Sequence, residues 1–156
     1  MRHLLQLVSV ILLLGIAGCK ADSPGKLETE TATFAKHRIF IRNKSQENPL
    51  PSNASTWGDG KEAFSHYCAA CHGMDGQNTG VPFADHISPP IPLLTSKDVQ
   101  SYTDGQLKWI LDNGISPSGM PGSKGTLSDD EQWSIIVYLR HLPAAGSQGT
   151  PEMYSH

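Results

Sequence analysis

Apolar residues recur at helical spacing in three stretches of this chain, and glycine- and proline-rich segments lie between them. The first stretch places Ala63, Phe64, Tyr67 and Cys68 on one face of a helix that we expect to begin near Asp59. A helix with one apolar face buries that face against other elements, so this stretch is predicted to contribute to a helical core.

The second and third stretches carry clear start and stop signals. The second helix is predicted to follow the capping box of Thr103 and Gln106 and to stop at Gly114, which can adopt the left-handed cap conformation. The third is predicted to begin after Ser128, the first residue of another capping box, and to end before Pro143.

No alternating strand pattern competes with these helices, so the sequence predicts an all-α fold with three main helices and Gly/Pro-rich loops. Residues 38–42 alternate over five positions only, which is compatible with a short docking segment within a polar linker. The predicted organisation is a leader at 1–18, a linker at 19–56, a domain at 57–142 and a flexible tail at 143–156.

The leader has the pattern of a secretory signal. A basic start at Arg2 precedes a short uncharged apolar run that is too short to span a membrane comfortably. The run ends in Ile16-Ala17-Gly18-Cys19, which resembles the lipobox of bacterial lipoproteins. That resemblance implies that Cys19 is acylated and tethers the chain on the periplasmic side of a membrane or at the outer membrane, not in the cytoplasm. The alternative is an uncleaved apolar anchor.

Composition narrows the classes of partner. A formal net charge of -3 and 17% charged residues fit a soluble globular domain. Nothing in this balance is basic enough to favour nucleic acid, so we expect no nucleic-acid partner. Two of the three cysteines belong to one motif and the third is Cys19, which leaves no pair for a structural disulfide.

That motif, Cys68-Ala69-Ala70-Cys71-His72, is the attachment pattern of a c-type haem. Each thiol can form a thioether with one haem vinyl group, and one helical turn sets the two sulfurs at a suitable separation. The next residue then presents an imidazole to the iron as an axial ligand. The sequence therefore predicts one covalently bound haem c per chain.

Two other kinds of protein site are also built from a Cys-x-x-Cys pair. A thioredoxin-like redox pair is expected within alternating strands and helices, and that alternation does not surround Cys68 and Cys71. A structural zinc site needs four ligands, and the chain has no second cysteine pair to supply them. Both alternatives are therefore disfavoured.

Met120 is the best candidate for the second axial ligand. It stands between glycine and proline in a stretch that cannot be helical, and a loop methionine with small neighbours can reach over a porphyrin face. Met74 is too close to the motif, and Met153 lies in the tail. His86 and His141 are weaker rivals that are better explained as solvated or capping residues.

Taken together, these motifs resemble those of class I cytochromes c, over residues 60–142. The resemblance implies that Gly60 and Phe64 pack against the last helix, with Tyr138 as a partner. It also implies that a proline carbonyl accepts the N–H of the axial imidazole. The sequence leaves the choice among Pro89, Pro90 and Pro92 open.

The resemblance implies electron transfer between redox protein partners. Imidazole and thioether ligands fill both axial positions, so we expect little reorganisation on electron transfer and no small-molecule substrate at the iron. We expect a membrane-tethered, single-haem electron carrier that is not itself an enzyme. A haem subunit of a larger oxidoreductase and a haem-based gas sensor are the alternatives.

Overall fold

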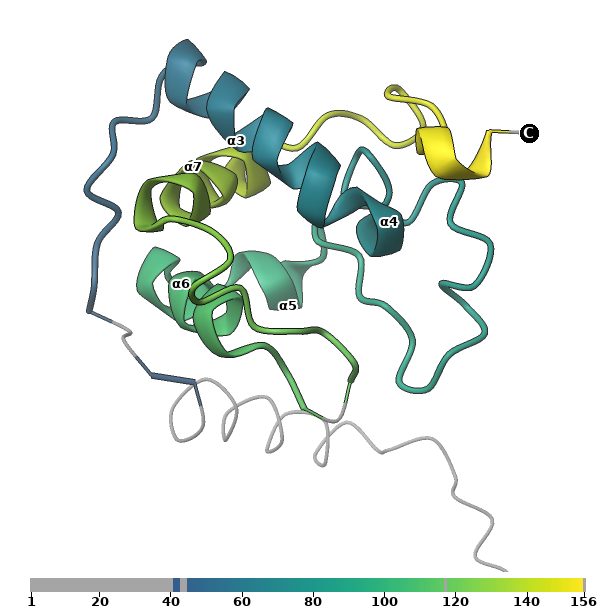
Figure 1. Ribbon diagram of the computed structural model, residues 1–156, viewed down its shortest axis with the longest axis horizontal. Coiled ribbons are helices and arrows are strands. Elements are labelled where there is room, and N and C mark those ends of the chain that lie inside the picture. Colours follow the sequence, from purple (N-terminus) through teal and green to yellow (C-terminus); the bar gives the residue numbers. More distant parts are fainter. Residues whose placement is uncertain (1–40, 43–44, 117, 156) are drawn as a thin grey trace, which may run out of the picture. The chain divides into compact units, whose positions relative to one another are not determined.

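The computed structural model describes residues 41–42, 45–116 and 118–155. The predicted leader, Cys19 and most of the predicted linker lie outside these ranges. Helices in the described part are α3 (Ala54–Tyr67), α4 (Ala69–His72), α5 (Lys97–Gln100), α6 (Asp104–Asn113) and α7 (Asp129–Arg140), followed by the 3₁₀ helix η2 (Glu152–Tyr154) (Figure 1).

The predicted all-α class is confirmed, with α3, α6 and α7 as the three main helices. Within the described ranges the chain forms no sheet, and the pairs Ile115–Met120 and Lys124–Leu127 are isolated bridges. No helix of the described residues is long and apolar enough to cross a membrane.

α3 begins at Ala54, so the predicted start near Asp59 is wrong by five residues. The physical reason is Asn53, whose side-chain oxygen accepts a hydrogen bond from the Thr56 N–H at 2.9 Å and so satisfies one of the free donors at the helix start. The starts of α6 and α7 are confirmed, because both predicted capping boxes form.

α3 and α7 pack against each other at the centre of the domain (Figure 1). A Cβ placed on Gly60 would lie 2.0 Å from the backbone oxygen of Ser134, so the two helices meet where glycine leaves room. The rings of Phe64 and Tyr138 lie 5.1 Å apart beside this contact, and Trp57 lies 5.4 Å from Tyr138 on its other side. The packing that the family resemblance implied is therefore present.

Part of the predicted linker packs on the domain. Ile41 is buried in the same hydrophobic cluster as Phe64, and Leu50 is partly buried against that cluster. Asn48 donates a hydrogen bond from its side-chain amide to the backbone oxygen of Trp133 at 3.0 Å. The packed part of the chain thus begins before Trp57.

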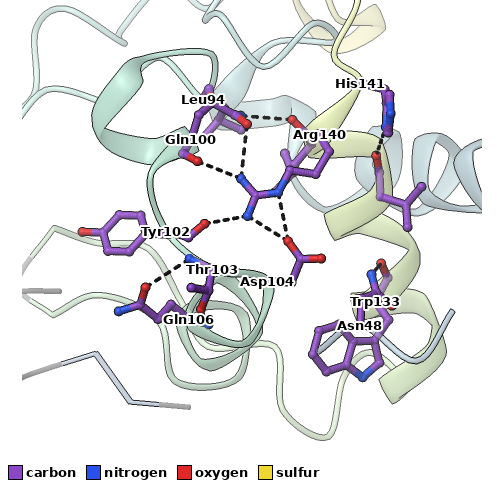
Figure 2. Close-up of polar contacts among 12 residues, drawn as sticks. Asn48, Leu94, Gln100, Tyr102, Thr103, Asp104, Gln106, Trp133, Arg140 and His141 are labelled. Carbon is purple, nitrogen blue, oxygen red and sulfur yellow. Dashed lines mark hydrogen bonds and ion pairs between the residues drawn. The ribbon is translucent and has the colours of Figure 1, made fainter. Parts of the chain in front are cut away.

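Arg140 joins the end of α7 to α5 and α6 (Figure 2). Its guanidinium donates to the Asp104 carboxylate at 2.8 and 2.9 Å, to both oxygens of Gln100, and to the Tyr102 carbonyl at 2.5 Å. The Gln100 side chain in turn donates to the Leu94 carbonyl at 2.7 Å. Through Leu94, this network holds the far end of the long loop that follows α4.

Candidate haem-attachment site

The two motif cysteines and His72 lie on one turn of the chain. α3 ends at Tyr67, Cys68 caps it, and α4 continues through Ala69–His72. The backbone N–H groups of Cys71 and His72 both donate to the Cys68 carbonyl, at 3.1 and 3.0 Å. Gly73 then takes φ 68°, a left-handed conformation that glycine adopts without strain, and ends the turn.

The thiol of Cys68 is held in its neutral form. Burial, and then the nearby charge of Cys71, raise the pKa of the Cys68 thiol to about 12. A redox-active pair and a zinc site both need the thiolate, so this environment suits neither of them. A thioether carries no charge, so burial does not oppose it.

His72 is held as a neutral imidazole. Burial lowers the pKa of its ring to about 4, so the ring carries no proton charge at neutral pH and a nitrogen lone pair can bind a metal. Its Nδ1 is buried and forms no hydrogen bond with any residue that the structure describes. In this structure, therefore, none of Pro89, Pro90 and Pro92 accepts a hydrogen bond from it, and the choice among them stays open.

Asn78 links His72 to the proline-rich part of the loop. Its backbone N–H donates to the His72 carbonyl at 2.8 Å, and its side-chain amide donates to the Ile91 carbonyl at 2.9 Å. Asn78 has φ 62°, a left-handed conformation that asparagine tolerates better than most residues. Ile91 stands between two of the candidate prolines, so Asn78 fixes the backbone that carries them.

Asp75 organises the turn after His72. Its side chain is fully buried and accepts hydrogen bonds from the Gln77 N–H at 2.9 Å, the Thr79 hydroxyl at 2.6 Å and the Gly146 N–H at 2.7 Å. Burial raises the pKa of this carboxyl, but the hydrogen bonds outweigh burial and hold the pKa below its usual value. A buried carboxylate therefore ties this turn to the C-terminal segment.

Met120 lies in a tight loop after α6. The Ile115 N–H donates to the Met120 carbonyl at 3.0 Å, and the Ser118 N–H donates to the Ile115 carbonyl at 2.9 Å. The Met120 side chain is partly buried against the hydrophobic core. Gly114 opens the loop, and a Cβ there would lie 2.4 Å from the Met120 carbonyl oxygen, so glycine permits this close return of the chain.

The rival residues occupy several places in the domain. Met74, like Met120, is partly buried against the core, and Met153 is half exposed in η2. His141 caps the end of α7, with its Nδ1 3.0 Å from the Val137 carbonyl oxygen, and His86 is exposed in the loop after α4.

Large apolar side chains are exposed on the segments that carry the candidate ligands. Tyr67 precedes the motif and is 54% exposed; Ile87 and Leu93 follow it, and Ile115 lies in the Met120 loop. Exposed apolar groups on the segments that carry these residues favour an apolar ligand. Together with the neutral thiol and neutral imidazole, they fit a covalently held haem.

An open cavity of about 500 Å³ is lined by the segment before α3, the start of α6 and the end of α7. Its charged wall includes Arg140 and Asp104, which are paired with each other. The rival candidate His141 lines this cavity, whereas Cys68, Cys71, His72 and Met120 do not.

Sequence reasoning missed Asp75, Asn78 and Tyr154. The Asp75-Gly76 pair is a turn signal, which would have predicted a carboxylate bonding the backbone two residues on. Tyr154 donates from its hydroxyl to the Ala70 carbonyl at 2.9 Å across 84 positions of sequence. No local pattern indicates such a contact.

Comparison with known proteins adds two findings. The family described as "Cytochrome C oxidase, cbb3-type, subunit III" matches residues 55–139. A thiosulfate dehydrogenase of Stutzerimonas stutzeri (strain A1501) is 30% identical over 94 residues, which are 60% of this chain. The matched region spans 29% of the length of that relative.

Proposed function

The chain belongs to the family of cytochrome c oxidase, cbb3-type, subunit III, whose cytochrome c domain implies electron transfer, and we propose that it works as a single-haem electron carrier between redox proteins. When bound, haem c supplies one-electron exchange between Fe(III) and Fe(II). The protein contributes the attachment, the axial ligands and the surroundings of the iron.

Each candidate residue has one role in this proposal. Cys68 and Cys71 would attach the haem through thioethers, and His72 and Met120 would bind its iron. With an imidazole and a thioether of the protein bound to the iron, no position would be left for a substrate. The observation that carries the proposal is the single turn of Cys68, Cys71 and His72, with the Cys68 thiol and the His72 imidazole both held neutral.

The role of Met120 is tested by its replacement. Met120→Ala should abolish the weak sulfur-to-Fe(III) charge-transfer band, lower the reduction potential and allow carbon monoxide to bind the ferrous protein. Wild type should not bind carbon monoxide, and Met153→Ala, at an exposed methionine, should behave as wild type. Carbon monoxide binding by wild type would instead favour a gas sensor.

We further propose that Cys19 anchors the chain to a membrane. The support is the sequence pattern at 16–19, together with the need to assemble haem c outside the cytoplasm. A multiply acylated cysteine binds membranes stably, since each buried CH₂ contributes about 0.8 kcal/mol. In the full-length precursor, Cys19→Ser should prevent labelling by a fatty-acid probe and move the protein to the soluble fraction. Retention in the membrane fraction would favour an uncleaved anchor.

A haem subunit of a larger oxidoreductase is the second candidate. The matched family is named for an oxidase subunit, and the thiosulfate dehydrogenase relative is much longer than the region matched. Both observations favour a cytochrome c domain that works beside a catalytic partner. Stable co-purification with a second redox protein from native membranes supports the subunit role, and isolation as a single chain supports the free carrier.

A further inference from the structure

The C-terminal segment 143–155, here called the C-terminal strap, lies along the haem-attachment segment 70–83. The Gln77 side-chain amide donates to the Pro143 carbonyl at 3.2 Å, and the Gly146 N–H donates to Asp75 at 2.7 Å. Further along, Tyr154 donates to the Ala70 carbonyl at 2.9 Å. The two stronger attachments thus fall on residues 70 and 75, one on each side of His72.

The bond from Tyr154 completes a helix end. α4 stops at His72 because Gly73 turns away, so the carbonyls of its last turn lack the N–H groups that a longer helix would supply. The Gly73 N–H serves the Ala69 carbonyl, and the Tyr154 hydroxyl serves the Ala70 carbonyl. Ala70 lies between the two cysteines, so this bond holds the turn at 68–72 that carries both thiols, here called the attachment turn.

The hydrogen bond from Gly146 to Asp75 holds the chain on the C-terminal side of His72. A fully buried carboxylate must have partners, and Gly146 supplies one of its three donors from outside the turn. Charge-assisted hydrogen bonds of this kind are about twice as strong as neutral ones.

Packing closes the strap over the segment. The rings of Tyr154 and Phe83 meet edge to face with centroids 6.2 Å apart, and Pro151 is buried. A Cβ on Gly80 would lie 2.5 Å from the methyl carbon of Thr150, so glycine allows the strap to approach closely. The contacts therefore run along the whole strap.

We propose that the C-terminal strap is a positioning element of the haem site, with Tyr154 and Asp75 as its positioning residues. It holds the attachment turn on both sides of His72 and adds apolar cover beside it through Tyr154 and Pro151. Apolar surroundings disfavour the more highly charged Fe(III), so the strap raises the reduction potential. This inference rests on the proposed haem attachment at Cys68, Cys71 and His72.

The test compares the full-length wild-type holoprotein with three variants: Tyr154→Phe, a truncation after Pro143, and Ser155→Ala. Tyr154→Phe keeps the ring against Phe83 and loses the bond to Ala70. Ser155→Ala is the matched control, because among the described residues the Ser155 hydroxyl bonds only within the strap, to the Glu152 carbonyl at 2.8 Å. Covalent haem content, reduction potential and the hyperfine-shifted proton resonances of the His72 ring are measured for each.

We expect covalent haem in all four proteins. The potential should fall in Tyr154→Phe and fall further in the truncation, with shifted His72 resonances in both, while Ser155→Ala matches wild type. An unchanged potential and unchanged His72 resonances in Tyr154→Phe overturn the strap's role, whatever the truncation does. Absence of covalent haem from wild type overturns the proposed function instead, so the two failures are distinguishable.

Discussion

At the scale of single residues, the site is built from groups whose charge the fold controls. The Cys68 thiol and the His72 ring are kept neutral by burial, whereas Asp75 is kept ionised by its hydrogen bonds. The two neutral groups suit thioether formation and iron binding. The ionised carboxylate lies three residues after His72 and stabilises the turn through its donors.

Asp75 should make the fold sensitive to acid. Its folded-state pKa lies below the usual value of 3.8, so its contribution to stability is present above about pH 4 and is lost as the pH falls through the folded-state pKa. Asp75→Asn should lower the free energy of unfolding at pH 7 by about 2 kcal/mol, because an amide replaces a charged acceptor.

Denaturant unfolding at pH 7 and pH 3 measures this effect. The gap in stability between wild type and Asp75→Asn should narrow at the lower pH. Asp85→Asn, at an exposed carboxylate in the following loop, should stay close to wild type at both values. A gap that persists unchanged at pH 3 would mean that the ionised carboxylate is not what stabilises the turn.

At the scale of helices, the close approach of α3 and α7 sets the frame from which the attachment turn extends. Cys68 directly follows α3, so a shift of α3 along α7 would move the whole motif. Tyr138 of α7 also donates from its hydroxyl to the Met74 carbonyl at 2.8 Å, which binds the turn after His72 to the same frame.

Two glycines of α3 offer a matched test of this approach. Gly60→Ala puts a methyl group into the backbone of Ser134 and should destabilise the domain by about 3 kcal/mol or prevent folding. Gly58 has open space around its Cβ position, so Gly58→Ala should be neutral or stabilise by about 0.5–1 kcal/mol. Thermal unfolding of the two variants measures the difference. Equal unfolding midpoints for Gly60→Ala and Gly58→Ala would contradict this packing.

Local sequence patterns were sufficient to predict α6 and α7. A capping box joins residues only three positions apart, so the sequence pattern itself contains both partners of the hydrogen bonds that start the helix. The start of α3 was mispredicted because the apolar pattern becomes clear only after Asp59, whereas Asn53 caps the helix through a single polar contact. The Phe64–Tyr138 contact came from the family resemblance rather than from periodicity.

At the scale of the whole molecule, the attachment turn is held by segments that are distant in sequence. The C-terminal strap bonds to residues 70 and 75, and Arg140 reaches the loop after α4 through Gln100 and Leu94. Composition indicated a polar tail at 143–156, and nothing local marks Tyr154 as a partner of Ala70. Contacts of this kind form only when segments distant in sequence come together in the folded chain. The haem-attachment motif could therefore be predicted from sequence, but the distant segments that hold it in place could not.

The central claim is that Cys68 and Cys71 hold one haem covalently, and intact mass spectrometry tests it most directly. The holoprotein is extracted with acidified acetone, which removes haem that is bound non-covalently, and its mass is compared with that of Cys68→Ala/Cys71→Ala. The account predicts that wild type retains the mass of one haem after extraction and that the double variant retains none. Loss of the haem from wild type under the same treatment would contradict the account.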